Sequence, residues 1–182
     1  MPRDDVLRAA LRDDKFRALP ASARALFAEM LILGPTSSAG VLPLMPAKWA
    51  AGSLDTTERS AMEDLALLSA VDRVVVDLKT FEVLIRNFIR DCGVWRNPNH
   101  FRGALNSAQD VASPFLRQCL ALELRRIGGP LVLEAVEVLT ADMDSDNRED
   151  APEMERQGID DVSAPGSEPN SVRPSGDSSE VP

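Results

Sequence analysis

The sequence is poor in the side chains from which most active sites and metal sites are built. Its 182 residues include one histidine, two cysteines and no tyrosine, and it contains neither a glycine-rich phosphate loop nor a nucleophile motif. Histidine and cysteine supply many of the general bases, nucleophiles and metal ligands of proteins. We therefore expect a protein that is not an enzyme and that needs neither a cofactor nor a metal.

The two cysteines are isolated from each other and from histidine. Cys92 and Cys119 form no Cys-x-x-Cys motif, which argues against a zinc site and against a disulfide framework. Cys92 lies near Arg90 and Arg96 in the sequence, and such charges lower a thiol pKa. No motif supplies a base to accompany that thiol, so it gives little support to an enzyme.

Long hydrophobic runs are also missing. No stretch reaches the roughly 18 apolar residues that a membrane-spanning helix needs. The charged start MPRDDVLRAALRDDKF lacks the apolar stretch of a signal peptide. We expect the protein to reside in the reducing cytoplasm, with no membrane contact.

The net charge of −9 comes entirely from the end of the chain. Residues 1–140 contain 17 Lys and Arg against 17 Asp and Glu, whereas residues 141–182 contain 3 against 12. The neutral body can therefore bind phosphate despite the acidic total. The segment 141–182 has almost no large apolar residues, so we expect a disordered acidic tail. It would solubilise the protein, dock on a partner, or compete with nucleic acid for the basic surface.

Apolar periodicity predicts helices in the first part of the chain. Residues 3–16 alternate in charge and predict a helix with a solvated face. The alternative is a docking stripe formed by Leu7, Ala10, Leu11 and Asp14. A second helix should begin near Ser22 and end before Gly34 and Pro35. Its expected buried stripe consists of Ala23, Leu26, Phe27, Met30 and Leu31.

A short strand and two helices should follow. The apolar run around Pro43 predicts a strand at a sheet edge, because proline cannot donate to a ladder. Residues 46–52 predict a two-turn helix with proline first and glycine last. Asp55, with Glu58 three residues later, is a capping-box pattern that predicts a helix over 56–69.

Residues 73–89 contain two β-branched runs separated by a polar turn at Lys79 and Thr80, which predicts a hairpin. In its second strand Arg86, Phe88 and Arg90 would alternate onto one face.

Three more helices are predicted after the hairpin. Asn97-Pro98 and Ser113-Pro114 each combine a capping residue with a proline at the first helical position. Their expected apolar stripes are Phe101, Ala104, Leu105 and Ala108, and Leu116, Cys119, Leu120, Leu124 and Ile127. In 130–140 one stripe holds Val132, Ala135, Val136 and Leu139, while Leu131, Leu133 and Val138 lie off it. A helix that is apolar on two sides needs two partners, which predicts a dimer or partner contact through those three residues.

This order of elements is that of a winged helix-turn-helix. The expected fold class is mainly α with a small β-hairpin (α+β). Residues 1–90 would form the winged helix-turn-helix, 91–140 a helical extension packed on it, and 141–182 the disordered tail.

Four stretches carry a resemblance to a known family: FRALPASARALFAEML, AGVLPLMPAKWA, VVVDLKTFEVLIRNFIRDCGVWRNPNHFRGAL and ASPFLRQCLALELRRI. Together they resemble actinobacterial and actinophage winged-helix proteins, which are similar to the N-terminal domains of phage replisome organisers and replication initiators. The resemblance covers roughly residues 10–127, and its most specific part is 85–99. It implies DNA binding tied to phage or prophage replication or its regulation.

The predicted recognition helix is acidic for a helix that reads bases. It carries Glu58, Glu63 and Asp64, which repel phosphate. A scaffold helix with a solvated acidic face is therefore the favoured interpretation. Basic residues gather instead around the hairpin and after it, beside the flat side chains of Trp95 and His100.

The residues that could contact DNA are Lys48, Thr57, Arg59, Ser60, Arg73, Lys79, Arg86, Arg90, Arg96, Asn97, Asn99, His100 and Arg102. Contacts to the phosphate backbone are more strongly indicated than base readout. An alternative gives the same stretch a packing role: Trp95 and Phe101 would be core, Asn97 only a cap, and the arginines paired with Asp91 and other carboxylates. The function predicted is DNA binding in replication initiation or its regulation. The alternative is a protein–protein adaptor that assembles through the winged helix and residues 130–140, as a homodimer or with a replication protein.

Overall fold

The computed structural model describes residues 2–52 and 56–141. All of these residues belong to one unit. The predicted acidic tail, apart from Ala141, lies outside the described residues, and so does Asp55.

Five helices and one strand precede the hairpin. They are α1 (Pro2–Leu11), α2 (Asp14–Arg17), α3 (Ala21–Ile32), β1 (Val41–Pro43), α4 (Pro46–Ala51) and α5 (Glu58–Ala70). The predicted stripe of α3 is confirmed, because its buried residues are Ala23, Leu26, Phe27, Met30 and Leu31. The helix from Pro46 with Gly52 as its C-cap is confirmed as well.

The start of α5 differs from the prediction. Its N-cap is Thr57, whose side chain accepts a hydrogen bond from the Ser60 backbone N–H, while the Ser60 side chain accepts one from the Thr57 N–H. The capping box therefore begins two residues later than expected, with serine in place of glutamate.

The predicted helix over 3–16 has its solvated face, but it is divided into α1 and α2 and also has a buried face. Val6 and Ala10 of α1 are 2% and 0% exposed. Phe16 of α2 is fully buried and meets the ring of Phe27 edge-on at 5.2 Å between centroids. The charge alternation masked these apolar positions, which hold α1 and α2 against α3.

The sheet has three antiparallel strands in the order β1-β3-β2. The hairpin strands are β2 (Val74–Asp77) and β3 (Glu82–Ile85), and β1 with Pro43 forms an edge, as predicted. The hairpin is shorter than expected. Asn87 adopts a left-handed backbone conformation with φ 57°, and helix α6 (Phe88–Asp91) follows at once. The expected alternation of Arg86, Phe88 and Arg90 along one strand is therefore wrong.

The last part of the described chain is helical. It comprises the 3-10 helix η1 (Val94–Arg96), α7 (Pro98–Gln109), α8 (Pro114–Ile127) and α9 (Pro130–Ala141). Both predicted caps are confirmed, with Asn97 accepting from the α7 N-terminus and Ser113 from the Leu116 N–H at 3.0 Å. The predicted boundary between residues 90 and 91 falls inside α6.

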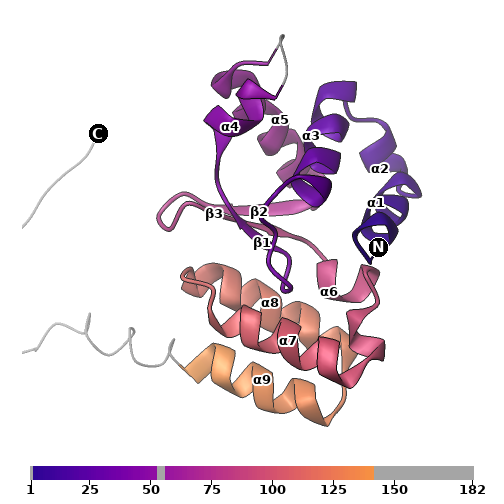
Figure 1. Cartoon of the computed structure of the whole chain (residues 1–182), viewed down its shortest axis with the longest axis vertical. Helices are drawn as coiled ribbons and strands as arrows, with labels where there is room; N and C mark the ends of the chain where they lie inside the picture. The colour runs from indigo at the N-terminus through magenta and orange to yellow at the C-terminus, as the bar shows by residue number, and fades with distance from the viewer. Residues whose placement is uncertain (1, 53–55, 142–182) are drawn as a thin grey trace, which may run out of the picture. The chain divides into compact units, whose positions relative to one another are not determined.

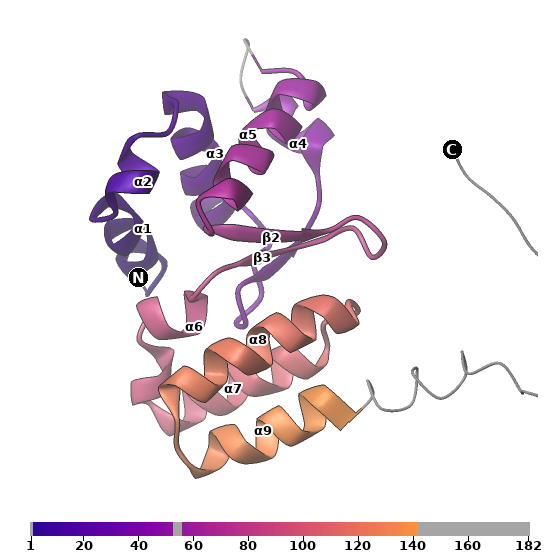
Figure 2. The same ribbon diagram turned by 180° about the vertical axis from the view of Figure 1, so that it is seen from behind.

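The sheet lies between two helical layers (Figures 1 and 2). Val83 and Ile85 of β3 join the hydrophobic cluster built by α1 to α5, whereas Leu84 between them joins the cluster built by α7 to α9. Successive side chains of a strand point to opposite faces. The hairpin is consequently covered on both faces, and the fold is mainly helical with a small antiparallel sheet.

Hydrogen bonds connect the hairpin to the start of α8. The Glu82 carboxylate accepts hydrogen bonds from the Ala112 and Ser113 backbone N–H groups at 3.2 and 2.8 Å. The Ser113 hydroxyl donates to Asp77, and this bond is the main reason why the pKa of Asp77 is lowered. The hairpin thereby fixes where the second helical layer begins.

No helix within residues 2–52 and 56–141 is long and apolar enough to cross a membrane.

Leu84 tests the shared role of the sheet. Replacing this fully buried side chain with alanine should lower the free energy of unfolding by about 2–5 kcal/mol, because it leaves a cavity between β3 and the C-terminal helices. Leu78, which is 61% exposed in the hairpin turn, is the control, and its alanine variant should change stability by less than about 0.5 kcal/mol. Urea unfolding measures both. An equal loss of stability in the two variants would show that Leu84 does not contribute to the core.

Candidate nucleic-acid interface

Two of the arginines predicted to meet DNA point into the protein. The Arg73 side chain is 14% exposed, pairs with Asp13 and lies over the Phe16 ring at 5.9 Å. Asp13 accepts from the Lys15 N–H and from Arg73, and these bonds lower its pKa. Arg73 thus joins β2 to the start of α2 and cannot contact a phosphate without breaking that pair.

Arg86 has a similar internal position, after β3. Its side chain is 15% exposed, and its Nε lies 2.9 Å from Glu123 Oε1 on α8 and 3.5 Å from Asp72 Oδ1. The short contact lacks hydrogen-bond geometry, since neither Nε nor Oε1 has a hydrogen-bond partner in the described structure. The pair links the sheet to the C-terminal helical layer.

Glu123 is the most perturbed acid of this cluster. Burial raises its pKa from 4.5 to about 7, although Arg86 and the Asn87 N–H at 2.8 Å oppose the shift. The carboxyl group is 8% exposed, so the loss of water outweighs the attraction of a poorly aligned guanidinium.

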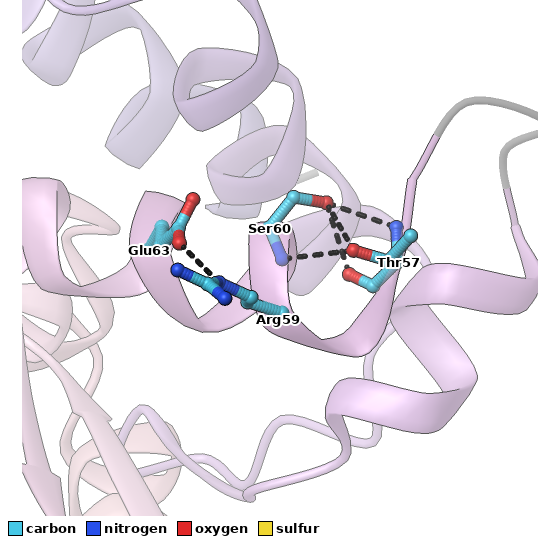
Figure 3. A network of polar contacts seen from close by, with 4 residues as sticks. All are labelled: Thr57, Arg59, Ser60 and Glu63. Atoms are coloured by element: carbon cyan, nitrogen blue, oxygen red, sulfur yellow. Dashed lines mark hydrogen bonds and ion pairs between the residues drawn. The ribbon is translucent and has the colours of Figure 1, made fainter.

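The polar groups at the start of α5 are engaged with one another (Figure 3). Thr57 and Ser60 complete the capping box, and Arg59 Nε donates to Glu63 Oε1 at 2.9 Å. Asp64, expected on the exposed face, is only 8% exposed and accepts from the Ser22 hydroxyl. The outward face of α5 therefore presents Glu58 and a neutralised Arg59, which suits base reading poorly.

The two lysines of the predicted interface are exposed but separate from the other basic groups. Lys48 lies on α4, and Lys79 lies in the hairpin turn, where its N–H donates to Asp77. The hairpin turn and the start of α7 occupy opposite ends of the sheet in both views (Figures 1 and 2). The predicted interface is therefore not one continuous basic stripe.

The remaining basic groups gather where α6 leads into α7. Trp95 is 40% exposed, its Nε1 donates to the Arg90 carbonyl, and the Arg96 guanidinium lies 5.4 Å from the centre of its ring. Asn97 caps α7, so the part of the alternative that made Asn97 a cap and Phe101 a core residue is confirmed. Arg90 is bonded to Asp91 at 2.9 Å, again as the alternative held.

We call the exposed group formed by Trp95, Arg96, Asn99, His100 and Arg102 the α7 entry surface. Within the described residues no carboxylate pairs with Arg96 or Arg102. A guanidinium beside an exposed indole can neutralise a phosphate while a base stacks on the ring. This surface has the chemistry for backbone contacts without sequence readout.

Helix α9 has the two-sided character expected of it. Val132, Ala135, Val136 and Leu139 are buried, as predicted. Leu133 and Val138 are 66% and 46% exposed, whereas Leu131 is half-buried and packs on the C-terminal cluster. Leu122 of α8 adds another half-exposed apolar side chain in the same helical layer.

The cysteines are unlike reactive thiols. Both are free, and burial raises the pKa of Cys92 and of Cys119. The expected lowering of the Cys92 pKa by nearby arginines does not occur, because desolvation is the largest effect on this thiol.

Sequence analysis did not find Glu123. The signal was present, since position 123 falls on the stripe of Leu116, Leu120 and Leu124, where a charged residue must be buried and paired. Its partners, Arg86 and the Asn87 N–H, lie far away in the sequence and could not be identified from periodicity.

Comparisons with protein families, with curated proteins and with solved structures find no match to this chain.

Glu123 predicts a pH dependence of stability. Between about pH 4.5 and 7 the unfolded chain releases a proton that the folded protein retains, so this group lowers stability as the pH rises through that window. The difference in unfolding free energy between the wild type and Glu123→Gln should therefore fall by up to about 1.4 kcal/mol per pH unit from pH 5 to 7 and level off above pH 8.

Urea unfolding at several pH values measures this difference. Glu134→Gln, on the exposed face of α9, is the control and should follow the wild type. A difference for Glu123→Gln that stays constant from pH 5 to 8 would show that the carboxyl is ionised throughout.

Proposed function

We propose that the described part of the chain is a winged helix-turn-helix module that binds DNA. The observation that carries the proposal is the order α3-β1-α4-α5-β2-β3 combined with the sheet order β1-β3-β2. In this assignment α4 and α5 are the helix-turn-helix pair and the β2-β3 hairpin is the wing.

The proposed contact is electrostatic and goes through the α7 entry surface. The face of α5 offers no unpaired cation, because Arg59 is bonded to Glu63. Arg96 is exposed beside Trp95 at the N-terminus of α7, and Arg102 is exposed in the second turn of that helix. Binding of this kind tolerates many sequences and weakens steeply with salt.

The biological setting of the proposal comes from the resemblance described above. Residues 10–127 resemble winged-helix proteins of phage replication, so the proposed binding would serve replication initiation or its regulation in a phage or prophage. Many winged helices instead bind proteins, which is why the DNA contact needs a direct test.

Arg96 and Arg102 provide that test. Changing both to alanine should weaken binding to duplex and single-stranded DNA uniformly across sequences and lower the slope of log K against log salt by about 2. The measurement is a fluorescence anisotropy titration over a salt series.

The matched control is Arg125→Ala with Arg126→Ala, which removes the same charge from exposed positions in the last turn of α8. This variant should keep the wild-type slope. An identical loss in both variants would indicate a general charge effect, and no binding by the wild type at low salt would reject the DNA proposal.

A second candidate is a protein–protein adaptor that assembles through α9. The observation that favours it is the exposure of Leu133, Val138 and Leu122 on the C-terminal helical layer. Exposed apolar side chains on neighbouring helices are typical of a docking surface.

Self-association through α9 has its own test. Leu133→Glu with Val138→Glu should leave the circular dichroism spectrum unchanged and shift the protein from dimer to monomer in analytical ultracentrifugation. Leu67→Glu with Leu78→Glu changes two exposed apolar residues elsewhere and should remain dimeric. A wild type that sediments as a monomer at tens of micromolar, on the order of ordinary dimer affinities, would reject the homodimer.

A further inference from the structure

A cavity of about 420 Å³ opens where the two helical layers meet. Its lining comes from α1, from the loop before β1, from α6 and from the start of α7. This volume is within the usual range for sites that hold a small ligand.

The polar side chains of the lining all carry hydrogen-bond donors. They are Arg3, Thr36, Ser37, Ser38, Asn99 and His100, and none of the described lining residues is acidic. That bias is notable because residues 1–140 contain equal numbers of acidic and basic side chains. The Cys92 thiol also lines the cavity, and its raised pKa keeps it uncharged. The lining therefore favours an anion.

Arg3 is held in place at this cavity. Its Nη1 donates to the Leu31 carbonyl at 3.2 Å and its Nη2 to the Thr36 carbonyl at 2.8 Å. Neither acceptor is a carboxylate, so the positive charge is not neutralised by these bonds. These two bonds hold the guanidinium in place, and it keeps further N–H groups for another acceptor.

Gly103 provides an independent observation that points to a ligand. It lies inside α7, where glycine costs about 0.5–1 kcal/mol relative to alanine. Neither packing nor backbone conformation requires it: a Cβ built on Gly103 would meet nothing within 4 Å, and its φ is not positive. Gly103 lines the cavity, and any larger side chain there would occupy part of the space.

The apolar part of the lining suits a flat or hydrophobic body. Phe88 and Val94 lie on the side of α6 and η1, and Phe88 is fixed by close packing against Gly40. A Cβ at Gly40 would come within 2.4 Å of the Phe88 side chain. The aromatic wall is therefore set by the core and needs no rearrangement to receive a ligand.

We propose that this cavity binds a small organic phosphate of about mononucleotide size, with the phosphate at Arg3, the two serine hydroxyls and His100, and its flat body against Phe88 and Val94. An arginine with several neutral donors can bind more acceptor oxygens than the two that a carboxylate has. A phosphate supplies more oxygens and therefore fits this cluster better. The inference does not depend on DNA binding by the α7 entry surface, although Asn99 and His100 belong to both.

The test is a titration of the full chain with deoxyadenosine monophosphate, deoxyadenosine and inorganic phosphate, followed by two-dimensional amide NMR. The monophosphate should bind, and deoxyadenosine should bind at least about tenfold more weakly because it lacks the charge-assisted contacts. Arg3→Ala should weaken monophosphate binding by a similar factor. Gly103→Leu should abolish it without loss of the fold, since the new side chain enters open space in a helix.

Gln109→Leu, an exposed change on the same helix, is the matched control and should bind like the wild type. Equal binding by the wild type and Gly103→Leu, or no monophosphate binding at about 10 mM, the weak end of ligand affinities, would overturn the proposal.

A 5′-phosphorylated oligonucleotide separates this cavity from the α7 entry surface. If Gly103→Leu removes the binding of both the oligonucleotide and the monophosphate, the result supports the cavity. It also identifies a nucleic-acid end as a source of the phosphate. Oligonucleotide binding that Gly103→Leu leaves intact belongs to the α7 entry surface. Without monophosphate binding, that result would reject the cavity and leave the proposed function standing.

Discussion

The structure depends on one short strand that is buried on both faces. In β3, Val83 and Ile85 belong to the cluster of the N-terminal helices and Leu84 to that of the C-terminal helices. Because strand side chains alternate, three successive residues separate and line two hydrophobic clusters. The left-handed Asn87 then ends the strand and turns the chain into α6, whose Phe88 and Ile89 again enter different clusters. The two helical layers are therefore parts of one folding unit and not a domain with a loose extension.

The C-terminal helices cover the second face of the hairpin, so fewer of the charged side chains beside its strands are exposed to solvent. Arg73 and Arg86 border the strands, and each is paired with a carboxylate that tertiary packing delivers, Asp13 and Glu123. A buried arginine must have such a partner, since an unpaired charge in the interior is far more costly than an exposed one. Arg96 and Arg102 remain exposed near the start of α7. This is why the proposed electrostatic contact is placed at the α7 entry surface and not on α5.

A buried acid with a raised pKa and a cavity lined by polar side chains both lie where the two helical layers meet. Glu123 has a pKa near 7 there, and the cavity beside Arg3 and Gly103 lies along the same boundary. Packing two helical layers against a narrow sheet leaves gaps at its edges, and such gaps can be closed by large side chains. Gly103 instead leaves such a gap open. It destabilises α7 relative to alanine, and no close packing contact requires a glycine there. The proposed ligand would account for Gly103.

The sequence by itself determined the local structure to a large extent. The stripes of α3, α7 and α9, the Asn97 and Ser113 caps and the edge position of β1 follow from periodicity, capping and proline chemistry, which act within a few residues. Thr57 was missed as the cap of α5 because Asp55 offered the same chemistry two residues earlier. Only the tertiary structure decided which charged side chains became internal. Arg73 and Arg86 meet Asp13 and Glu123 across 60 and 37 positions of the chain, a pairing that is set by how the layers dock and not by spacing. The cavity has the same origin, because Arg3 and Gly103 are brought together by packing alone.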